Sequence, residues 1–182
     1  MRADARRKYD RIVEAATEVV VEQGTDASLN EVARRAGVGP GTLYRHFPTR
    51  EDLINAVMTN WVERIQAIAE AAVGSTQPPR GLLLSWFEGV VAHIGEHSGF
   101  PARLIAAMDD PQSHLHGKCE VLIAANARVM HRLSADGALR GGADSAEICR
   151  LVMGIAVVAD EGKLAPPAVH PMLAIVADGL LT

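Results

Sequence analysis

The sequence has few cysteines and no long apolar run, and each shortage excludes a class of protein. Its two cysteines, Cys119 and Cys149, fit neither zinc-finger spacing nor a disulfide framework, which favours a reducing compartment. The longest apolar stretch, residues 151–159, is far shorter than the roughly 18 residues of a membrane span. The charged N-terminus is followed by no apolar segment and so does not resemble a signal peptide. We therefore expect a cytoplasmic protein without membrane contact.

Signatures of catalysis and of metal binding are missing as well. The sequence has no GxSxG, HExxH or P-loop, and Gly39-Pro40-Gly41 lacks both the third glycine and the preceding strand of a dinucleotide site. His93 and His97 have the i, i+4 spacing that can ligate zinc, but no complete ligand set follows from the spacing. We expect neither an enzyme nor a bound metal or other cofactor.

The charge is distributed unevenly. Hydrophobic residues make up 48% and charged residues 22% of the chain, an ordinary globular balance. Residues 1–50 carry nine Lys/Arg against seven Asp/Glu, whereas residues 51–182 carry nine against fifteen. The overall charge of −4 therefore combines a weakly basic N-terminal part with an acidic remainder. A basic end of this kind is typical of a nucleic-acid-binding region.

The periodicity predicts an all-α fold of about nine helices, because strand-like alternation is almost absent. Apolar residues recur at helical spacing before residue 24, and a long helix is predicted to begin at residues 49–52. The clearest break is the Gly/Ser/Pro-rich segment 74–79. Further helices are predicted at 80–97, which is apolar on most sides, and at 101–108, 113–135, 145–160 and 168–181.

Two short helices are predicted between residues 28 and 47. Ser28 and Glu31 have the spacing of a capping box, in which each side chain would bind the other residue's backbone N–H. Gly37 is expected to end this helix in the left-handed conformation, and Pro40 is suited to the first position of the next one. Helices joined so closely form a helix-turn-helix, whose second helix lies in the major groove of DNA.

The second helix has one inner and one outer face. Leu43 and Phe47, at i and i+4, are expected to face the core. Thr42, Arg45 and His46 then project outward, and Gly41 leaves room for DNA to approach the backbone. An outward arginine can form a bidentate contact with guanine, worth about 1–3 kcal/mol of base discrimination. The basic N-terminal arm is placed to contact phosphates.

The segment from Ser28, SLNEVARRAGVGPGTLYRHFPTRE, resembles the signature of the TetR/AcrR family of bacterial transcription regulators almost position for position, within a resemblance over about residues 6–65. It implies a DNA-binding domain at residues 1–65 and a helical effector-binding and dimerisation domain at 66–182. It also implies a homodimer that binds a near-palindromic operator as a repressor and is released by an unknown small molecule. The residues matched to DNA-contacting positions are Thr42, Tyr44, Arg45, His46 and Arg50, and those at the start of the supporting helix are Ser28 and Asn30.

Several of these residues have structural alternatives. Tyr44 could instead support the domain, Ser28 could serve only as a cap, and the pair Arg34-Arg35 fits a solvated face better than a DNA contact. A protein that has lost DNA binding and keeps only a ligand-binding or scaffold role is a further alternative, although the intact recognition helix opposes it. Activation instead of repression stays open, because the motif does not encode the sign of regulation.

The C-terminal region offers weaker expectations. Trp86, Val90 and His93 share one helical face and could line an effector pocket, although a plain core stripe with one satisfied histidine explains the spacing better. The other candidate pocket residues are Phe87, Phe100, Met108 and Met130. The last two helices are largely apolar and are expected to form an intersubunit four-helix bundle. The candidate interface residues are Leu151, Val152, Ile155, Val158, Val169, Met172, Leu173 and Val176.

Overall fold

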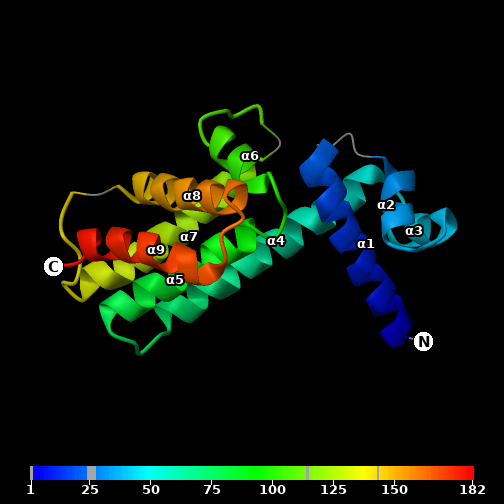
Figure 1. Ribbon diagram of the computed structural model, residues 1–182. Helices are drawn as coiled ribbons and strands as arrows, with labels where there is room; N and C mark the ends of the chain where they lie inside the picture. Colours follow the sequence, from blue (N-terminus) through cyan, green and yellow to red (C-terminus); the bar gives the residue numbers. More distant parts are fainter. Residues whose placement is uncertain (1, 24–27, 114, 143) are drawn as a thin grey trace. The chain divides into compact units, whose positions relative to one another are not determined.

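The computed structural model describes residues 2–23, 28–113, 115–142 and 144–182, and these residues form nine α-helices (Figure 1). The helices are α1 (Arg2–Gln23), α2 (Leu29–Arg35), α3 (Pro40–His46), α4 (Arg50–Val73), α5 (Pro79–Ile94), α6 (Phe100–Ala106), α7 (His116–Ala135), α8 (Ser145–Glu161) and α9 (Pro166–Leu180). Extended pairing within the described ranges is limited to one isolated bridge between Leu139 and Leu181. The all-α prediction is confirmed. None of the helices in the described parts could span a membrane.

The chain divides into two compact units, Met1–Trp61 and Val62–Thr182. The division falls inside α4, a few residues before the boundary expected at residue 65. No glycine or proline marks this position in the sequence, and α4 continues through it without interruption. The break at residues 74–79 is instead the turn between α4 and α5.

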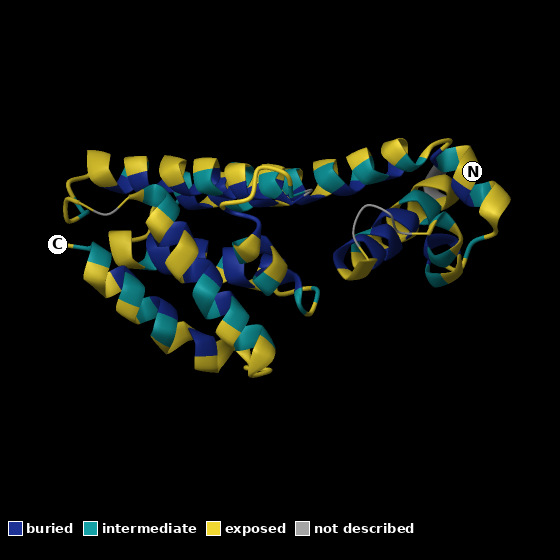
Figure 2. Cartoon of the chain, turned by 90° about the horizontal axis from the view of Figure 1, so that it is seen from above, coloured by how far each residue is buried: buried dark blue, intermediate teal, exposed yellow. Residues whose placement is uncertain are grey.

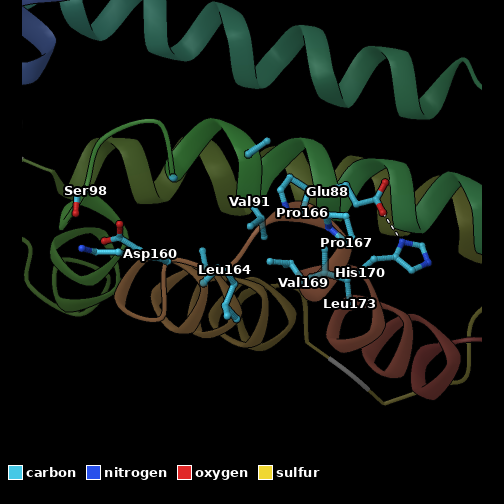
Figure 3. A pocket seen from close by; sticks show the side chains of 15 residues that line it. Glu88, Val91, Ser98, Asp160, Leu164, Pro166, Pro167, Val169, His170 and Leu173 are labelled. Carbon is cyan, nitrogen blue, oxygen red and sulfur yellow. Dashed lines mark hydrogen bonds and ion pairs between the residues drawn. The ribbon is translucent and has the colours of Figure 1, made fainter.

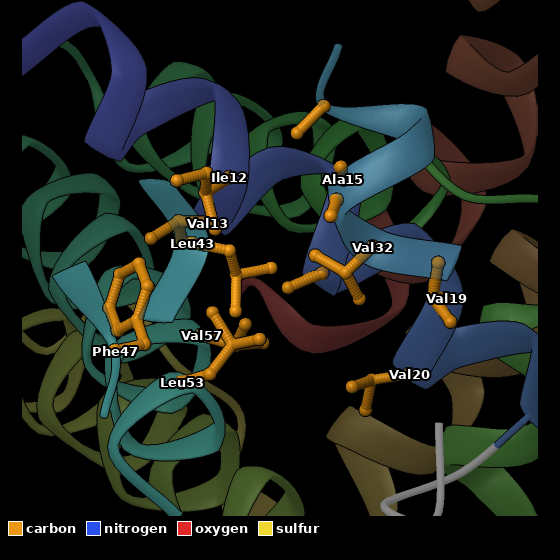
Figure 4. Close-up of a cluster of buried hydrophobic side chains, with 13 residues drawn as sticks. Ile12, Val13, Ala15, Val19, Val20, Val32, Leu43, Phe47, Leu53 and Val57 are labelled. Atoms are coloured by element: carbon orange, nitrogen blue, oxygen red, sulfur yellow. The ribbon is translucent and has the colours of Figure 1, made fainter. Parts of the chain in front are cut away.

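Unit 1 is built around one apolar cluster to which α1, α2, α3 and α4 contribute (Figure 4). Ile12 of α1, Leu43 of α3 and Val57 of α4 are each no more than 1% exposed. Phe47, which ends α3, closes the same cluster at 3% exposure. The inward assignment of Leu43 and Phe47 is therefore confirmed. Burying these side chains is the main force that orients α3 within the unit.

Unit 2 has α5 at its centre, as the apolar composition of residues 80–97 predicted. This helix packs against α7, α8 and α9, and most of its residues are buried. Figure 2 shows that many of the helices have exposed residues on one side and buried residues on the other. Its buried Trp86 donates the indole N–H to Asn126 Oδ1 at 2.8 Å, and the Asn126 amide donates to Ser145 of α8. These bonds satisfy the buried polar atoms of Trp86 and Asn126 and link three helices.

The capping prediction at Ser28 is wrong. Ser28 precedes α2 with extended backbone, but its side chain makes no cap bond. The carboxylate of Glu31 instead binds Arg34 and Arg35, which are stronger, charged donors. A reciprocal cap is found at α4, where the Asp52 N–H donates to Thr49 Oγ1 at 3.1 Å and the Thr49 N–H donates to the Asp52 carboxylate at 3.0 Å.

Candidate nucleic-acid interface

The turn between α2 and α3 has the geometry of a helix-turn-helix. Gly37 has a φ of +62°, a left-handed conformation that favours glycine. Its N–H donates to Arg34 O at 3.2 Å, and the Val38 N–H donates to Ala33 O at 3.0 Å. Both bonds belong to the Schellman motif, which ends α2 and redirects the chain. With Pro40 at its first position, α3 then begins three residues later.

The outer face of α3 presents polar side chains to solvent. Tyr44 is 48% exposed and Arg45 is exposed, so the supporting role considered for Tyr44 is not what the structure shows. Arg45 forms no ion pair with any described residue, which leaves its guanidinium available to a ligand. Thr42 is half-buried on the same helix, and Gly41 has open space where a Cβ would stand. These features suit an approach to the major groove.

His46 is held by an aromatic contact that the sequence did not reveal. The Tyr9 ring of α1 lies edge-on to the His46 ring, with the two ring centroids 6.2 Å apart. The centroid of the same Tyr9 ring lies 5.0 Å from that of Phe47. His46 is consequently half-buried, so only part of its ring can reach a ligand. Tyr9 precedes Ile12 by three residues, and this helical spacing was the available signal for its position on the inner face of α1.

The arginine pair of α2 is engaged within the protein. Arg35 Nη1 donates to Glu22 of α1 at 2.7 Å, and its Nε donates to Glu31 at 2.9 Å. Arg34 donates to the same Glu31 at 2.8 Å. Hydrogen bonds from Arg34 and Arg35 lower the pKa of Glu31 to about 2, so it stays ionised and keeps both guanidinium groups paired. Arg35 thus links α1 to α2, and the pairing of both arginines within the protein favours the non-contact interpretation.

The basic N-terminal arm is not a free arm. It forms the first turns of α1, where Arg6 pairs with Asp10 at 3.0 Å and Lys8 pairs with Asp4 at 2.7 Å. These exposed pairs reduce the positive charge that a phosphate would meet, and phosphate contacts there would compete with them. Among the remaining candidates, Ser28 and Asn30 are exposed at the start of α2, and Arg50 is half-buried at the start of α4.

The candidate pocket residues of unit 2 belong to its core. Trp86, Phe87 and Val90 surround a void of only about 10 Å³, too small for a ligand. His93 is buried with its Nδ1 3.5 Å from Glu96, and burial lowers its pKa to about 4. The remaining candidates, Phe100, Met108 and Met130, are also buried. The structure therefore corrects the expected pocket, because close packing fills the space around these large side chains.

A larger groove lies elsewhere in unit 2, between α5, α8 and α9 (Figure 3). Its volume is about 830 Å³, within the range of small-molecule sites. His170 Nδ1 lies 2.6 Å from Glu88 Oε1, within hydrogen-bond distance, at one end, and Ser98 and Asp160 lie at the other. Sequence reasoning missed this groove, because one wall comes from α5 and the others from α8 and α9, which lie far from α5 in the chain. None of the candidate pocket residues lines it.

The candidate dimer residues divide into two groups. Val152, Val169 and Leu173 are buried inside the subunit, which corrects their assignment to an exposed interface. Leu151 and Val158 of α8 are 59% and 53% exposed. Ile155, Met172 and Val176 are half-buried, and Ile175 of α9, which the sequence reasoning did not select, is 73% exposed. An apolar face thus remains on α8 and α9, formed by Leu151, Val158 and Ile175 and the three half-buried residues.

Comparisons with known proteins decide what this architecture is. The sequence profile of bacterial regulatory proteins of the tetR family matches residues 12–57, which include the helix-turn-helix. The profile of the SbtR-like transcriptional regulator C-terminal domain matches residues 78–182, more than half of the chain. The chain belongs to the TetR family.

Individual relatives agree with this assignment. A solved TetR transcriptional regulator from Streptomyces coelicolor is 31% identical, with a TM-score of 0.67 over 95% of this chain and 98% of the other. The HTH-type transcriptional regulators TtgW and SrpR of Pseudomonas putida are each 35% identical over 93 residues, half of this chain. The matched part spans 64% of TtgW and 40% of SrpR. The TetR-family chain is therefore a transcription regulator and not an enzyme.

Proposed function

We propose that this TetR-family regulator is a cytoplasmic repressor that reads a specific operator with α3 and is released by a small molecule. The observation that carries the proposal is the outer face of α3. Tyr44 and Arg45 are exposed there, while Leu43 and Phe47 anchor the helix from behind. Arg45 forms no ion pair with a described residue, so its guanidinium on this firmly packed helix is available to contact a base edge.

Dimerisation would supply the symmetry of the operator. The apolar face of α8 and α9 contains Leu151, Val158 and Ile175, each more than half exposed. Exposed apolar side chains at helical spacing favour burial against a second copy of the same face. A two-fold dimer carries two copies of α3, so we expect a near-palindromic operator with half-sites about one helical turn, or a multiple of it, apart.

The decisive experiment is selection of bound sequences from a random duplex library by the effector-free protein at moderate salt. A near-palindromic consensus would support a dimeric, sequence-specific regulator. Arg45→Ala should then weaken binding to the consensus about five- to 150-fold and relax the preference at one base position. The matched control is Arg128→Ala, an exposed arginine of α7, which should leave binding unchanged. Absence of enrichment would contradict operator binding by the effector-free form.

A further inference from the structure

The groove between α5, α8 and α9 has walls made of small and aliphatic side chains. Glu88, Val91, Ala92 and Gly95 follow one another along α5 at i, i+3, i+4 and i+7, a stripe about 10 Å long. The facing walls contain alanines of α8 and the Pro166-Pro167 start of α9. Among the described residues that line the groove, the His170 imidazole is the one aromatic ring. Such walls suit an aliphatic ligand better than a flat aromatic one.

Two of the most exposed residues of the apolar face proposed for dimerisation point away from the groove. Val158 of α8 is 53% exposed, whereas Ala156 and Asp160, two residues to either side, line the groove. On α9, Leu173 lines the groove and Ile175 is 73% exposed. Residues two apart on a helix lie about 200° apart around its axis. A partner that contacts Val158 and Ile175 would therefore approach from the side away from the groove.

The electrostatics of the Asp160 end favour a positive head group. Asp160 supplies a carboxylate, and two helices end there, since Gly95 caps the C-terminus of α5 and Asp160 lies in the last turn of α8. Helix C-termini carry partial negative charge and favour cations. The N-termini of α6 and α9 oppose this. The Gly99 N–H at the start of α6 already binds Asp160, whereas Pro166 and Pro167 of α9 lack the N–H groups of an anion site. Lys163, the one lysine among the lining residues, is exposed.

We propose that this groove binds an aliphatic cation, an amine or quaternary ammonium whose chain lies along α5 and whose head group lies at Asp160. The inference rests on the proposed function, since this ligand would be the effector. Asp160 Oδ2 also accepts the Gly99 N–H at 2.6 Å, just before α6. A bound cation competes for that carboxylate and weakens its hold on the start of α6, which gives occupancy of the groove a structural consequence.

The test uses the full chain and matched probes below their micelle concentrations, measured by calorimetry. Decyltrimethylammonium should bind more tightly than decanol or decanoate, and affinity should rise about fourfold per added methylene until the chain outgrows the groove. Asp160→Asn should lower the affinity for the cation about two- to fivefold and leave that for decanol unchanged. Glu70→Gln, which changes an exposed carboxylate of α4, is the matched control.

Further variants separate the possible failures. Ala92→Trp should fill the groove and abolish binding of all three probes. Ala127→Trp, at an exposed position of α7, should not affect binding. Tightest binding of decanoate, lost in Lys163→Gln, would overturn the choice of a cation, and unchanged binding in Ala92→Trp would overturn the site. Operator release is measured separately. If the cation binds the groove but does not release the operator, the effector role is refuted. If the library selection yields no consensus, the proposed function is refuted, and the probe measurements still decide whether the groove binds an aliphatic cation.

Discussion

Replacing Leu43 by alanine separates the stability of α3 from its recognition of DNA. Leu43 is 0% exposed, and its side chain points into the cluster with Ile12, Leu53 and Val57 (Figure 4). The substitution loses about 0.8 kcal/mol of transfer free energy per methylene and leaves a cavity among three helices. Together these effects give a loss of about 3 kcal/mol in the free energy of unfolding.

That loss is large for a unit of this size. At about 0.1 kcal/mol per residue, the unit Met1–Trp61 would have a free energy of unfolding of about 6 kcal/mol. Leu43→Ala should thus remove about half of it. If unit 1 unfolds by itself, its Tm should fall by roughly 10–25 °C, and if the whole chain unfolds together, by roughly 6–12 °C.

Scanning calorimetry and operator binding of two variants provide the assay. Leu43→Ala should lower Tm strongly, and at a temperature where unit 1 remains folded it should retain the sequence preference of the unchanged protein. Arg45→Ala, two residues further along the same helix, should shift Tm by no more than about 2–4 °C, since a surface change costs about 0.5 kcal/mol or less, and should lose operator affinity. An unchanged Tm for Leu43→Ala would refute the assigned packing of α3.

Three further predictions concern other parts of the chain. Ile175→Glu should halve the mass seen by light scattering, because it buries a charge in the proposed dimer face, and an unaltered mass would argue against that face. Burial lowers the pKa of Lys118 from 10.5 to about 8. Between these two pH values the unfolded chain therefore binds more protons at this group than the folded chain does. Because of this difference, the contribution of Lys118 to the free energy of unfolding rises as the pH rises from 8 to 10.5. Lys118→Met should therefore stabilise the protein at pH 7 by about 3 kcal/mol. In urea unfolding, this gain in the free energy of unfolding should shrink between pH 8 and 10.5. A gain that does not change with pH would contradict this reasoning. Thr49→Ala should cost about 1 kcal/mol because it removes the α4 cap, whereas Ser28→Ala should cost less than about 0.5 kcal/mol, and equal losses in thermal unfolding would show that the caps are misassigned.

The sequence was sufficient wherever the physics is local. The left-handed turn at Gly37 follows from the conformational freedom of glycine, and the start of α3 follows from the fixed φ of Pro40. The inward faces of Leu43 and Phe47 follow from the 3.6-residue period, because an apolar stripe on a short helix has only one core to face. Such features depend on neighbours a few residues apart, which the chain itself displays.

Tertiary structure decided what depends on distant partners. Glu31 has the spacing of a capping residue, but charged donors, one of them also bound to Glu22 on another helix, occupy its carboxylate. Val152 and Ile175 are both apolar residues of the last two helices, yet one is buried in the subunit and the other is 73% exposed. The groove arises because α5 meets α8 and α9, which follow it only after α6 and α7 in the chain, at a place where their side chains are small. Periodicity tells which residues share a face of one helix, but only the packing of helices decides whether that face meets a core, a groove or a partner.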